Sequence, residues 1–225
     1  MQARYGPCVT LPTFMYHHVQ DKDAAAANNQ TGLTVTPDIF RGHLQYLRDK
    51  GYQPTSPSVL TNFFDAGTAP PSKSVLLTFD DGYADFYATA FPLLREFGFP
   101  ATVFLATGLV DNPGYLSWNQ IAEMGGQNIY FANHTWSHKN VATATSVVEQ
   151  EISTAQTQLE DHGLNSARVF AYPYGLGNGI SQNYLASHNY SLAFTTLPGR
   201  ILCRGQRLTL PRIRVGNSRL DNYLP

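Results

Sequence analysis

Short apolar runs recur along the chain, and most of their residues are β-branched, aromatic or leucine. These runs lack the strict polar–apolar alternation of strands that have one face in water. Continuous apolar runs of this length are typical of strands buried on both faces, as in a parallel sheet. We predict such strands over residues 11–16, 74–79, 101–107, 128–133, 168–173 and 191–196.

The segments between these runs carry apolar residues at helical spacing. The first helix is predicted from Thr36, a favourable N-cap, with Pro37 at the first helical position and Gly51 as its stop. Two further helices, predicted over 84–97 and 146–162, are also followed by glycines. Strand–helix alternation of this kind predicts an α/β fold in which helices cover a parallel sheet.

Six or more parallel strands in a chain of 225 residues favour a distorted (β/α) barrel of mostly parallel strands over an open sheet. A chain of this length is most simply one domain, so we expect a single domain over residues 1–225. The polar stretch 20–32 and the segment 197–207 are predicted to be loops. In either architecture, functional residues gather at the carboxyl ends of the strands.

Composition narrows the classes of protein to which this chain can belong. Hydrophobic residues make up 43% and charged residues 14%, which allows a sizeable core and argues against disorder. The formal net charge of −1 gives no electrostatic reason to expect nucleic acid or an anionic membrane as a partner. No apolar stretch reaches the about 18 residues that a membrane-spanning helix needs. The first residues lack the features of a signal peptide, so the protein is either cytoplasmic or begins after a removed leader.

The two cysteines, Cys8 and Cys203, lie near opposite ends of the chain. They are either two unrelated buried thiols or one disulfide that ties the ends together. The second alternative would suit an exported protein, because disulfides persist in oxidising compartments.

Acidic residues and histidines follow the predicted strands at the ends where functional groups gather. Asp80 and Asp81 follow one strand, His134 and His138 follow another, and His17 follows the first. Two adjacent carboxylates at the end of a buried strand repel each other unless a cation or a hydrogen-bond donor compensates. Two histidines and one carboxylate with open positions suit Zn²⁺, Fe²⁺, Co²⁺ or Ni²⁺. The second carboxylate and the further histidine match in kind the base and the acid that acyl hydrolysis needs.

Each of these features also has a simpler explanation. Asp-Asp-Gly is good turn chemistry, and two histidines four residues apart are more commonly ordinary surface residues. Their shared position, at the same end of neighbouring strands, is what favours a metal site.

The sequence TFDDGYADFYATAFPLLREFGFPATVFL, followed by HTWSH and FAYPYG, resembles the polysaccharide deacetylases. This is the NodB-homology group, also called carbohydrate esterase family 4. The resemblance extends from about Leu11 to Val215, which we take as the core of a catalytic domain. The opening MYHHV is similar to the branch that includes the poly-β-1,6-N-acetylglucosamine deacetylases. In that branch the motifs are circularly shifted, and the catalytic-acid histidine comes from the first strand.

The resemblance implies a role for each residue at the predicted strand ends. Asp80 would be the general base, and His17 matches the position of the general acid. Asp81, His134 and His138 would be the protein ligands of one divalent metal ion. We expect that ion to be zinc, with nickel, cobalt or iron as alternatives.

The third motif implies further site residues and contains one departure from the family. The backbone N–H of Tyr174 would help to hold the oxyanion of the tetrahedral intermediate. Pro173 and Trp136 are expected to contact substrate, although Trp136 could equally pack beneath the metal ligands. Ala171 stands where family members commonly have an arginine that contacts the base. Arg212, on a predicted late strand, is our candidate replacement, and the alternative is a surface arginine with a structural role.

These roles imply an enzyme that removes N-acetyl groups from N-acetylglucosamine residues of a polysaccharide and releases acetate. Alternatives with the same site are an O-acetyl esterase acting on xylan and a deacetylase of peptidoglycan or chitin. A non-catalytic glycan-binding protein is disfavoured, because a binding protein needs no water-activating residues. Since the polymers lie outside the cell membrane, the resemblance implies a secreted, periplasmic or cell-surface protein. We expect a monomer whose partner is the glycan substrate.

For the remaining conspicuous residues we expect structural roles. We expect His18 to be secondary to His17, and His43 to lie on the surface or in packing. His162 and His188 lie near predicted helix ends. Trp118 is expected to pack at a helix start, and Asp85 to be a helix-surface or capping charge.

Overall fold

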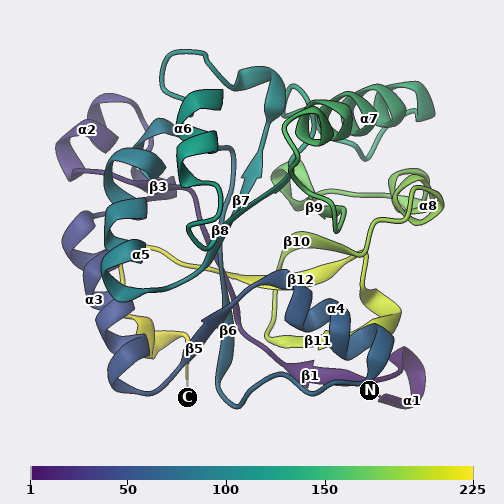
Figure 1. The fold of residues 1–225 in the computed structure, drawn as a ribbon, viewed down its shortest axis with the longest axis horizontal. Helices are drawn as coiled ribbons and strands as arrows, with labels where there is room; N and C mark the ends of the chain where they lie inside the picture. The colour runs from purple at the N-terminus through teal and green to yellow at the C-terminus, as the bar shows by residue number, and fades with distance from the viewer. Residues whose placement is uncertain (1, 225) are drawn as a thin grey trace.

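Seven parallel strands close into a barrel, and helices surround it (Figure 1). The computed structural model describes residues 2–224. Around the barrel the strands follow the order β2, β12, β10, β9, β8, β7, β6, and β6 pairs with β2 to close the ring. The predicted distorted (β/α) barrel is therefore confirmed. The barrel strands are β2 (Thr13–Tyr16), β6 (Ser74–Phe79), β7 (Ala101–Leu105), β8 (Ile129–Asn133), β9 (Val169–Ala171), β10 (Leu192–Pro198) and β12 (Leu210–Arg214).

Closure of the barrel places the first strand beside the strand that precedes the two aspartates. β2 pairs with β6 so that Tyr16 lies opposite Phe79, and β12 pairs with the other edge of β2. His17 and Asp80 are the next residues along these two strands, so they leave the barrel at the same level. The short strand β5 (Gln53–Thr55) adds to β6 outside the ring.

Helices cover the outside of the barrel. In Figure 1, α3 and α5 lie on one side of the strands, and α7 and α8 lie on the other. The helices predicted from Thr36 and over 146–162 are present as α3 and α7. The helices are α1 (Gln2–Tyr5), α2 (Lys22–Ala27), α3 (Pro37–Asp49), α4 (Pro57–Ala66), α5 (Phe91–Phe97), α6 (Trp118–Met124), α7 (Thr145–Asp161) and α8 (Gly179–Ser187).

The segment predicted as one helix over 84–97 has two parts. A π-helical turn, η2 (Phe86–Ala90), precedes α5. Pro92 lies at the start of α5 and has no N–H to donate to the carbonyl four residues earlier. A wider turn before a proline relieves this mismatch, which accounts for the change in helix type.

Both segments predicted to be loops contain regular structure. Residues 20–32 include α2, because four consecutive alanines favour a helix despite their polar surroundings. The segment 197–207 begins with the end of β10 and includes β11 (Ile201–Cys203). β11 pairs with β1 (Cys8–Thr10), a partner far away in the chain that local patterning does not reveal. The remaining short elements are β3 (His18–Val19), β4 (Thr34–Val35), η1 (Thr31–Leu33), η3 (Thr107–Leu109), η4 (Pro173–Gly175), η5 (Arg204–Gln206) and η6 (Leu220–Asn222).

Two predicted strands end earlier than expected. The strand predicted over 101–107 ends at Leu105, and the strand predicted over 168–173 ends at Ala171. In both cases the chain turns into a 3₁₀ helix, η3 or η4, as soon as it leaves the barrel.

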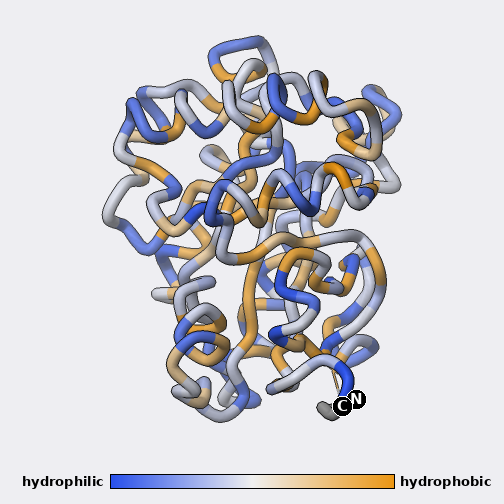
Figure 2. Tube along the Cα trace, turned by 90° about the vertical axis from the view of Figure 1, so that its right-hand side faces the viewer, coloured by the Kyte–Doolittle hydropathy of each residue, from blue (hydrophilic) through white to orange (hydrophobic). Residues whose placement is uncertain are grey.

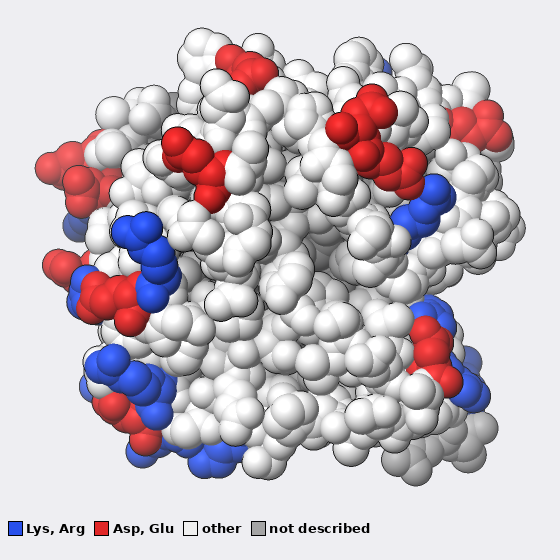
Figure 3. All heavy atoms as spheres, viewed as in Figure 1, with Lys and Arg blue, Asp and Glu red and all other residues white. Residues whose placement is uncertain are grey.

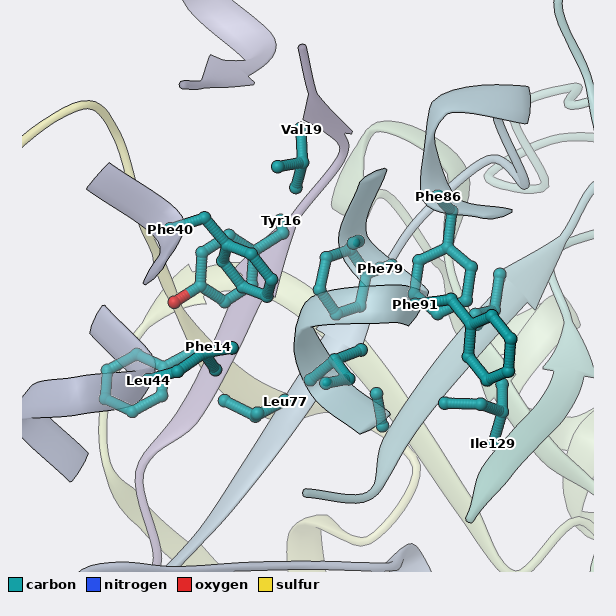
Figure 4. Packing of buried hydrophobic residues seen from close by; sticks show 14 of the residues in the cluster. Phe14, Tyr16, Val19, Phe40, Leu44, Leu77, Phe79, Phe86, Phe91 and Ile129 are labelled. Carbon is teal, nitrogen blue, oxygen red and sulfur yellow. The ribbon is translucent and has the colours of Figure 1, made fainter. Parts of the chain in front are cut away.

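Aromatic side chains form the core at the ends of β2 and β6. Figure 2 shows apolar segments concentrated in the central strands, with polar segments mostly in outer loops and helices. Phe79 stacks on Tyr16 with ring centroids 5.1 Å apart, and Phe40 meets Tyr16 edge to face (Figure 4). Phe86 packs against Phe79 at 4.8 Å. Because Tyr16 and Phe79 directly precede His17 and Asp80, this packing holds the backbone from which those two residues emerge.

Cys8 and Cys203 form a disulfide, so of the two alternatives for the cysteines the disulfide is correct and the two unrelated thiols are not. They lie opposite each other in the antiparallel pair of β1 and β11 and are 195 residues apart in the chain. A bond between such distant positions removes much conformational freedom from the unfolded chain.

Loss of this disulfide should lower the free energy of unfolding by about 2–5 kcal/mol. The measurement is urea denaturation of the wild type with and without reductant. The double variant Cys8→Ser, Cys203→Ser is the control. Its unfolding transition should match that of the reduced wild type and should not change when reductant is added. An unchanged midpoint after verified reduction would show that the bond does not stabilise the fold.

Candidate active site

The Asp80–Asp81 pair begins the site, at a sharp turn that follows β6. The backbone N–H of Asp80 still donates to the carbonyl of Tyr16, so its position is fixed by the barrel. Asp81 has φ 76° and Gly82 has φ 78°. The positive φ of residue 82 favours glycine, and a Cβ there would also lie only 2.7 Å from Leu105 Cδ2. The turn directs the two adjacent carboxylates to different partners.

Asp80 forms a buried, two-pronged ion pair with Arg212. The distances are 2.7 Å from Nη1 to Oδ1 and 2.6 Å from Nη2 to Oδ2, and Arg212 is fully buried. Arg212 also donates to Thr195 O and Thr78 Oγ1, which leaves its guanidinium little freedom. Burial alone would raise the pKa of Asp80, but the charge and hydrogen bonds of Arg212 outweigh it, so the pKa lies below its ordinary value. The structure therefore excludes the alternative of a surface arginine and brings Arg212 to the residue predicted to be the base.

Asp81, His134 and His138 form a second cluster beside this ion pair. Asp81 Oδ1 lies 3.1 Å from His134 Nε2 and 3.0 Å from His138 Nε2. One nitrogen or oxygen atom from each of the three residues lies within 4.8 Å of the others. Burial of the Asp81 carboxyl opposes its ionisation, but the two histidines outweigh it and hold its pKa well below the ordinary value.

The donor atoms of this cluster fit a divalent metal ion. His134 Nδ1–H donates to Ala171 O at 2.7 Å, which leaves the Nε2 lone pair free to face Asp81. Asp81 Oδ1 is buried and makes no hydrogen bond with aligned geometry in the described chain. Two imidazole nitrogens and a carboxylate oxygen that converge in this way are the ligand types that Zn²⁺ and similar ions take.

Strained backbone is concentrated around this cluster. Asp81, Thr135, His138 and Tyr174 have φ values of 76°, 72°, 59° and 60°. Non-glycine residues in this region cost on the order of 1–3 kcal/mol each, and they persist where surrounding structure holds them, often at functional sites.

His17 emerges from the end of β2, near both carboxylates. Burial lowers the pKa of His17, and the charges of Arg214 and Arg212 act in the same direction. Asp80 and Asp81 act in the opposite direction without fully compensating. The structure thus brings a histidine with a lowered pKa to the side of the site where a general acid was predicted.

The other predicted contact residues lie around the cluster. Tyr174 is 64% exposed, and its ring meets the ring of His138 edge to face at 4.9 Å. Pro173 is buried beneath it at the start of η4. Trp136 is half-buried and packs against Gly108, whose N–H donates to Trp136 O at 2.7 Å. Packing against η3 is therefore one role of Trp136.

Sequence patterning missed an interaction beside the site. Asp85 was expected to be a helix-surface or capping charge, but it makes no capping bond and instead accepts a hydrogen bond from His18 Nδ1 at 2.8 Å. His18 is buried, and the ring of Tyr83 stacks on it at 3.7 Å. Only the fold brings His18 and Asp85 together, because they are distant in sequence.

His43 and Glu151 are also buried. His43 donates from Nε2 to Ser218 O and accepts from the hydroxyl of Tyr16, so packing is its role and the surface alternative is wrong. Glu151 lies on α7 and is 1% exposed. A signal for Glu151 was present in the sequence, since it falls within the apolar stripe of the predicted helix 146–162.

Comparison with known proteins identifies the class to which this barrel and site belong. The family model for polysaccharide deacetylase matches residues 67–193, which include both aspartates, both histidines and the third motif. The chain belongs to the polysaccharide deacetylase family, and the predicted resemblance is confirmed.

Individual relatives extend this result. The chain is 29% identical over 206 residues to the putative polysaccharide deacetylase YxkH of Bacillus subtilis, covering 91% of this chain and 71% of that protein. It is 29% identical over 248 residues to the poly-β-1,6-N-acetyl-D-glucosamine N-deacetylase of Escherichia coli, covering 90% of this chain and 36% of that protein. Among solved structures, the Streptococcus pyogenes deacetylase PplD in complex with acetate has a TM-score of 0.89 and 31% identity, covering 97% of this chain and 98% of that one.

Proposed function

We propose that this chain is a metal-dependent deacetylase that removes N-acetyl groups from N-acetylglucosamine residues of a polysaccharide. The observation that carries the proposal is the buried Asp80–Arg212 pair lying beside the Asp81–His134–His138 cluster. One carboxylate is held ionised by an arginine while its neighbour faces two imidazoles. Two consecutive residues thus supply a proton acceptor, Asp80, and one member of the metal-ligand set, Asp81.

Asp81, His134 and His138 would hold the metal ion. When bound there, a divalent ion such as Zn²⁺ would polarise the acetyl carbonyl and lower the pKa of a water molecule. The two imidazoles and one carboxylate leave coordination positions open for water and substrate.

The chain's own residues would carry the protons of the reaction. Asp80 would accept a proton from the attacking water, and Arg212 would keep this carboxylate ionised and oriented. The backbone N–H of Tyr174 would donate to the oxyanion of the tetrahedral intermediate. His17 would donate a proton to the leaving amine, and its lowered pKa makes its protonated form a stronger acid for that step. The products are acetate and a glucosamine residue.

A polymeric substrate is supported by the surroundings of the site. The ring of Tyr83 stacks on the ring of Tyr115, with the ring centroids 5.2 Å apart. Both tyrosines line a pocket of about 380 Å³ together with polar side chains that include Gln20 and Gln30. Tyrosine side chains and amide groups suit the apolar faces and hydroxyls of a sugar, so this pocket would hold the residue next to the one that loses its acetyl group.

The charge distribution also fits an uncharged glycan. On the face drawn in Figure 3, acidic side chains lie in separate groups across the upper part, acidic and basic side chains lie together along the left and right edges, and the middle carries few charges. The named activity of the Escherichia coli relative supports N-acetylglucosamine as the acetylated sugar.

A secreted, periplasmic or cell-surface location is part of this proposal. The disulfide between Cys8 and Cys203 supports it, because such bonds persist in oxidising compartments. Within residues 2–224, no helix is both long enough and apolar enough to span a membrane.

Acetate release from defined acetylated glycans tests the proposal. The substrates are β-1,6- and β-1,4-linked N-acetylglucosamine oligomers and acetylxylan, each assayed with Zn²⁺, Co²⁺ or Ni²⁺ and with a chelator. We expect acetate from N-acetylglucosamine oligomers, loss of activity on chelation and recovery when metal is restored. Release from acetylxylan alone would make the protein an O-acetyl esterase, and no release with any of these metals would contradict the enzymatic role.

A further inference from the structure

The loop that joins the two histidines of the cluster adopts a backbone that is unfavourable by itself. His134 directly follows β8, and His138 lies four residues on. Between them Thr135 has φ 72°, and His138 itself has φ 59°. A left-handed backbone is a true outlier for a β-branched residue such as Thr135. The loop therefore needs contacts from the rest of the protein to keep this shape.

The two histidines differ in how they are held. His134 is 2% exposed and is fixed by its own hydrogen bond from Nδ1 to Ala171 O. The side chain of His138 is 23% exposed, and within residues 2–224 its ring has no comparable hydrogen bond to orient it. Apart from the edge-to-face contact with Tyr174, its position depends on the backbone that carries it.

Glu151 of α7 supplies the contacts that hold this backbone. Its carboxylate accepts from the backbone N–H of Ser137 at 2.8 Å and from Ser137 Oγ at 2.6 Å. Its main-chain carbonyl accepts from the N–H of Trp136 at 2.9 Å. Ser137 directly precedes His138, so the carboxylate fixes the residue from which that histidine departs.

The burial of Glu151 is costly, which argues that its carboxylate has a specific role. It is 1% exposed and lies in the apolar stripe of α7 with Val148, Ile152 and Ala155. The only cation near it in the described chain is the exposed Lys139, whose Nζ lies 3.5 Å from Oε1. A buried carboxylate in such a stripe is less favourable than an apolar residue unless its hydrogen bonds are needed.

We propose that Glu151 is a positioning residue that holds His138 in place to bind the metal ion. The inference rests on the metal site of the proposed function. It assigns a role to a residue that would contact neither the substrate nor the ion and whose carboxylate would act through Ser137. Outer partners of this kind typically contribute about 10- to 100-fold to metal affinity.

Zn²⁺ titration in competition with a chromophoric chelator tests the proposal without substrate. Glu151→Leu keeps the volume of the side chain and removes both acceptors, so Zn²⁺ affinity should fall by about 10- to 100-fold. Glu151→Gln keeps a carbonyl oxygen for the Ser137 N–H and should retain most of the affinity. Glu149→Leu, on an exposed position of the same helix, is the matched control and should bind Zn²⁺ like the wild type.

Hydrogen exchange of the metal-free protein gives a second readout that general destabilisation would not reproduce. In Glu151→Leu the Ser137 amide should exchange faster, because its acceptor has gone. The Trp136 amide should stay protected, because its acceptor is the main-chain carbonyl of residue 151. Should Glu151→Leu fail to fold, Ser137→Ala removes the hydroxyl bond alone and should weaken Zn²⁺ binding by up to about ten-fold.

The outcomes separate this proposal from the proposed function. Wild-type Zn²⁺ affinity in Glu151→Leu, or an equal loss in Glu149→Leu, would overturn the positioning role while leaving the metal site intact. Failure of the wild type to bind Zn²⁺ would overturn both proposals. A loss of Zn²⁺ affinity in Glu151→Leu that is absent from Glu149→Leu and small in Glu151→Gln would support the role of Glu151, even if no glycan released acetate.

Discussion

Replacing Asp80 with asparagine should lower the rate of acetate release by about 10²- to 10⁴-fold, the usual contribution of a general base. The amide has nearly the same shape but cannot accept the proton of the attacking water. Metal content should stay at the wild-type level, because Asp80 faces Arg212 and not the Asp81–His134–His138 cluster. Acetate release and metal analysis of the same purified variant provide the measurement.

The matched contrast is His134→Ala, which should lose the metal ion as well as activity. His134 is buried and supplies one of the three converging donor atoms. Asp49→Asn, on the exposed end of α3, serves as the control and should keep both properties. Full metal content in both Asp80→Asn and His134→Ala would show that the ligand assignment is wrong.

Replacing Arg212 with methionine should have the largest effect on stability. It removes one partner of a buried ion pair and leaves the carboxylate of Asp80 without compensation, at a cost of about 3–5 kcal/mol. Activity should fall as well, because the pKa of Asp80 would rise without the arginine and its orientation would be lost. Urea denaturation at neutral pH measures the first effect, and the acetate assay measures the second.

The double variant Asp80→Asn, Arg212→Met tells a broken ion pair from a packing defect. It removes both charges, so it should be more stable than Arg212→Met alone. If it is as unstable as the sum of the two single variants, the two side chains are not coupled and the ion-pair interpretation fails.

The pH dependence of the stabilisation by the Asp80–Arg212 ion pair follows from the direction in which the pKa of Asp80 is shifted. In the folded protein the pKa of Asp80 lies below its ordinary value of 3.8. Its contribution is therefore fully present above that ordinary value and is lost as the pH falls through the lower folded value. The difference in unfolding free energy between wild type and Arg212→Met should be largest near neutral pH and should narrow under acidic conditions. A difference that stays constant down to pH values of about 3 would exclude ionised Asp80 as its source.

The sequence by itself determined the strands of the barrel and the chemistry that follows them. A strand buried on both faces must be apolar along its whole length, so runs such as 74–79 and 128–133 are visible without a structure. Polar residues directly after such runs, as at Asp80 and His134, emerge at one rim of a parallel barrel. For this reason the two aspartates and the histidines of the candidate site could be named before the fold was known, whereas their roles, and the choice of Tyr174 and Arg212, came from the resemblance to the family.

Only the tertiary structure decided which of these groups meet and how they are held. Arg212 reaches Asp80 because β12 lies beside β2, a contact that spans 132 residues of sequence. The same holds for the pairing of Cys8 with Cys203 and of His18 with Asp85, and for the contact of Glu151 with the loop at Ser137. Local pattern records burial and propensity, whereas these partners are set by the closure of the barrel and by helix packing, which bring distant segments together.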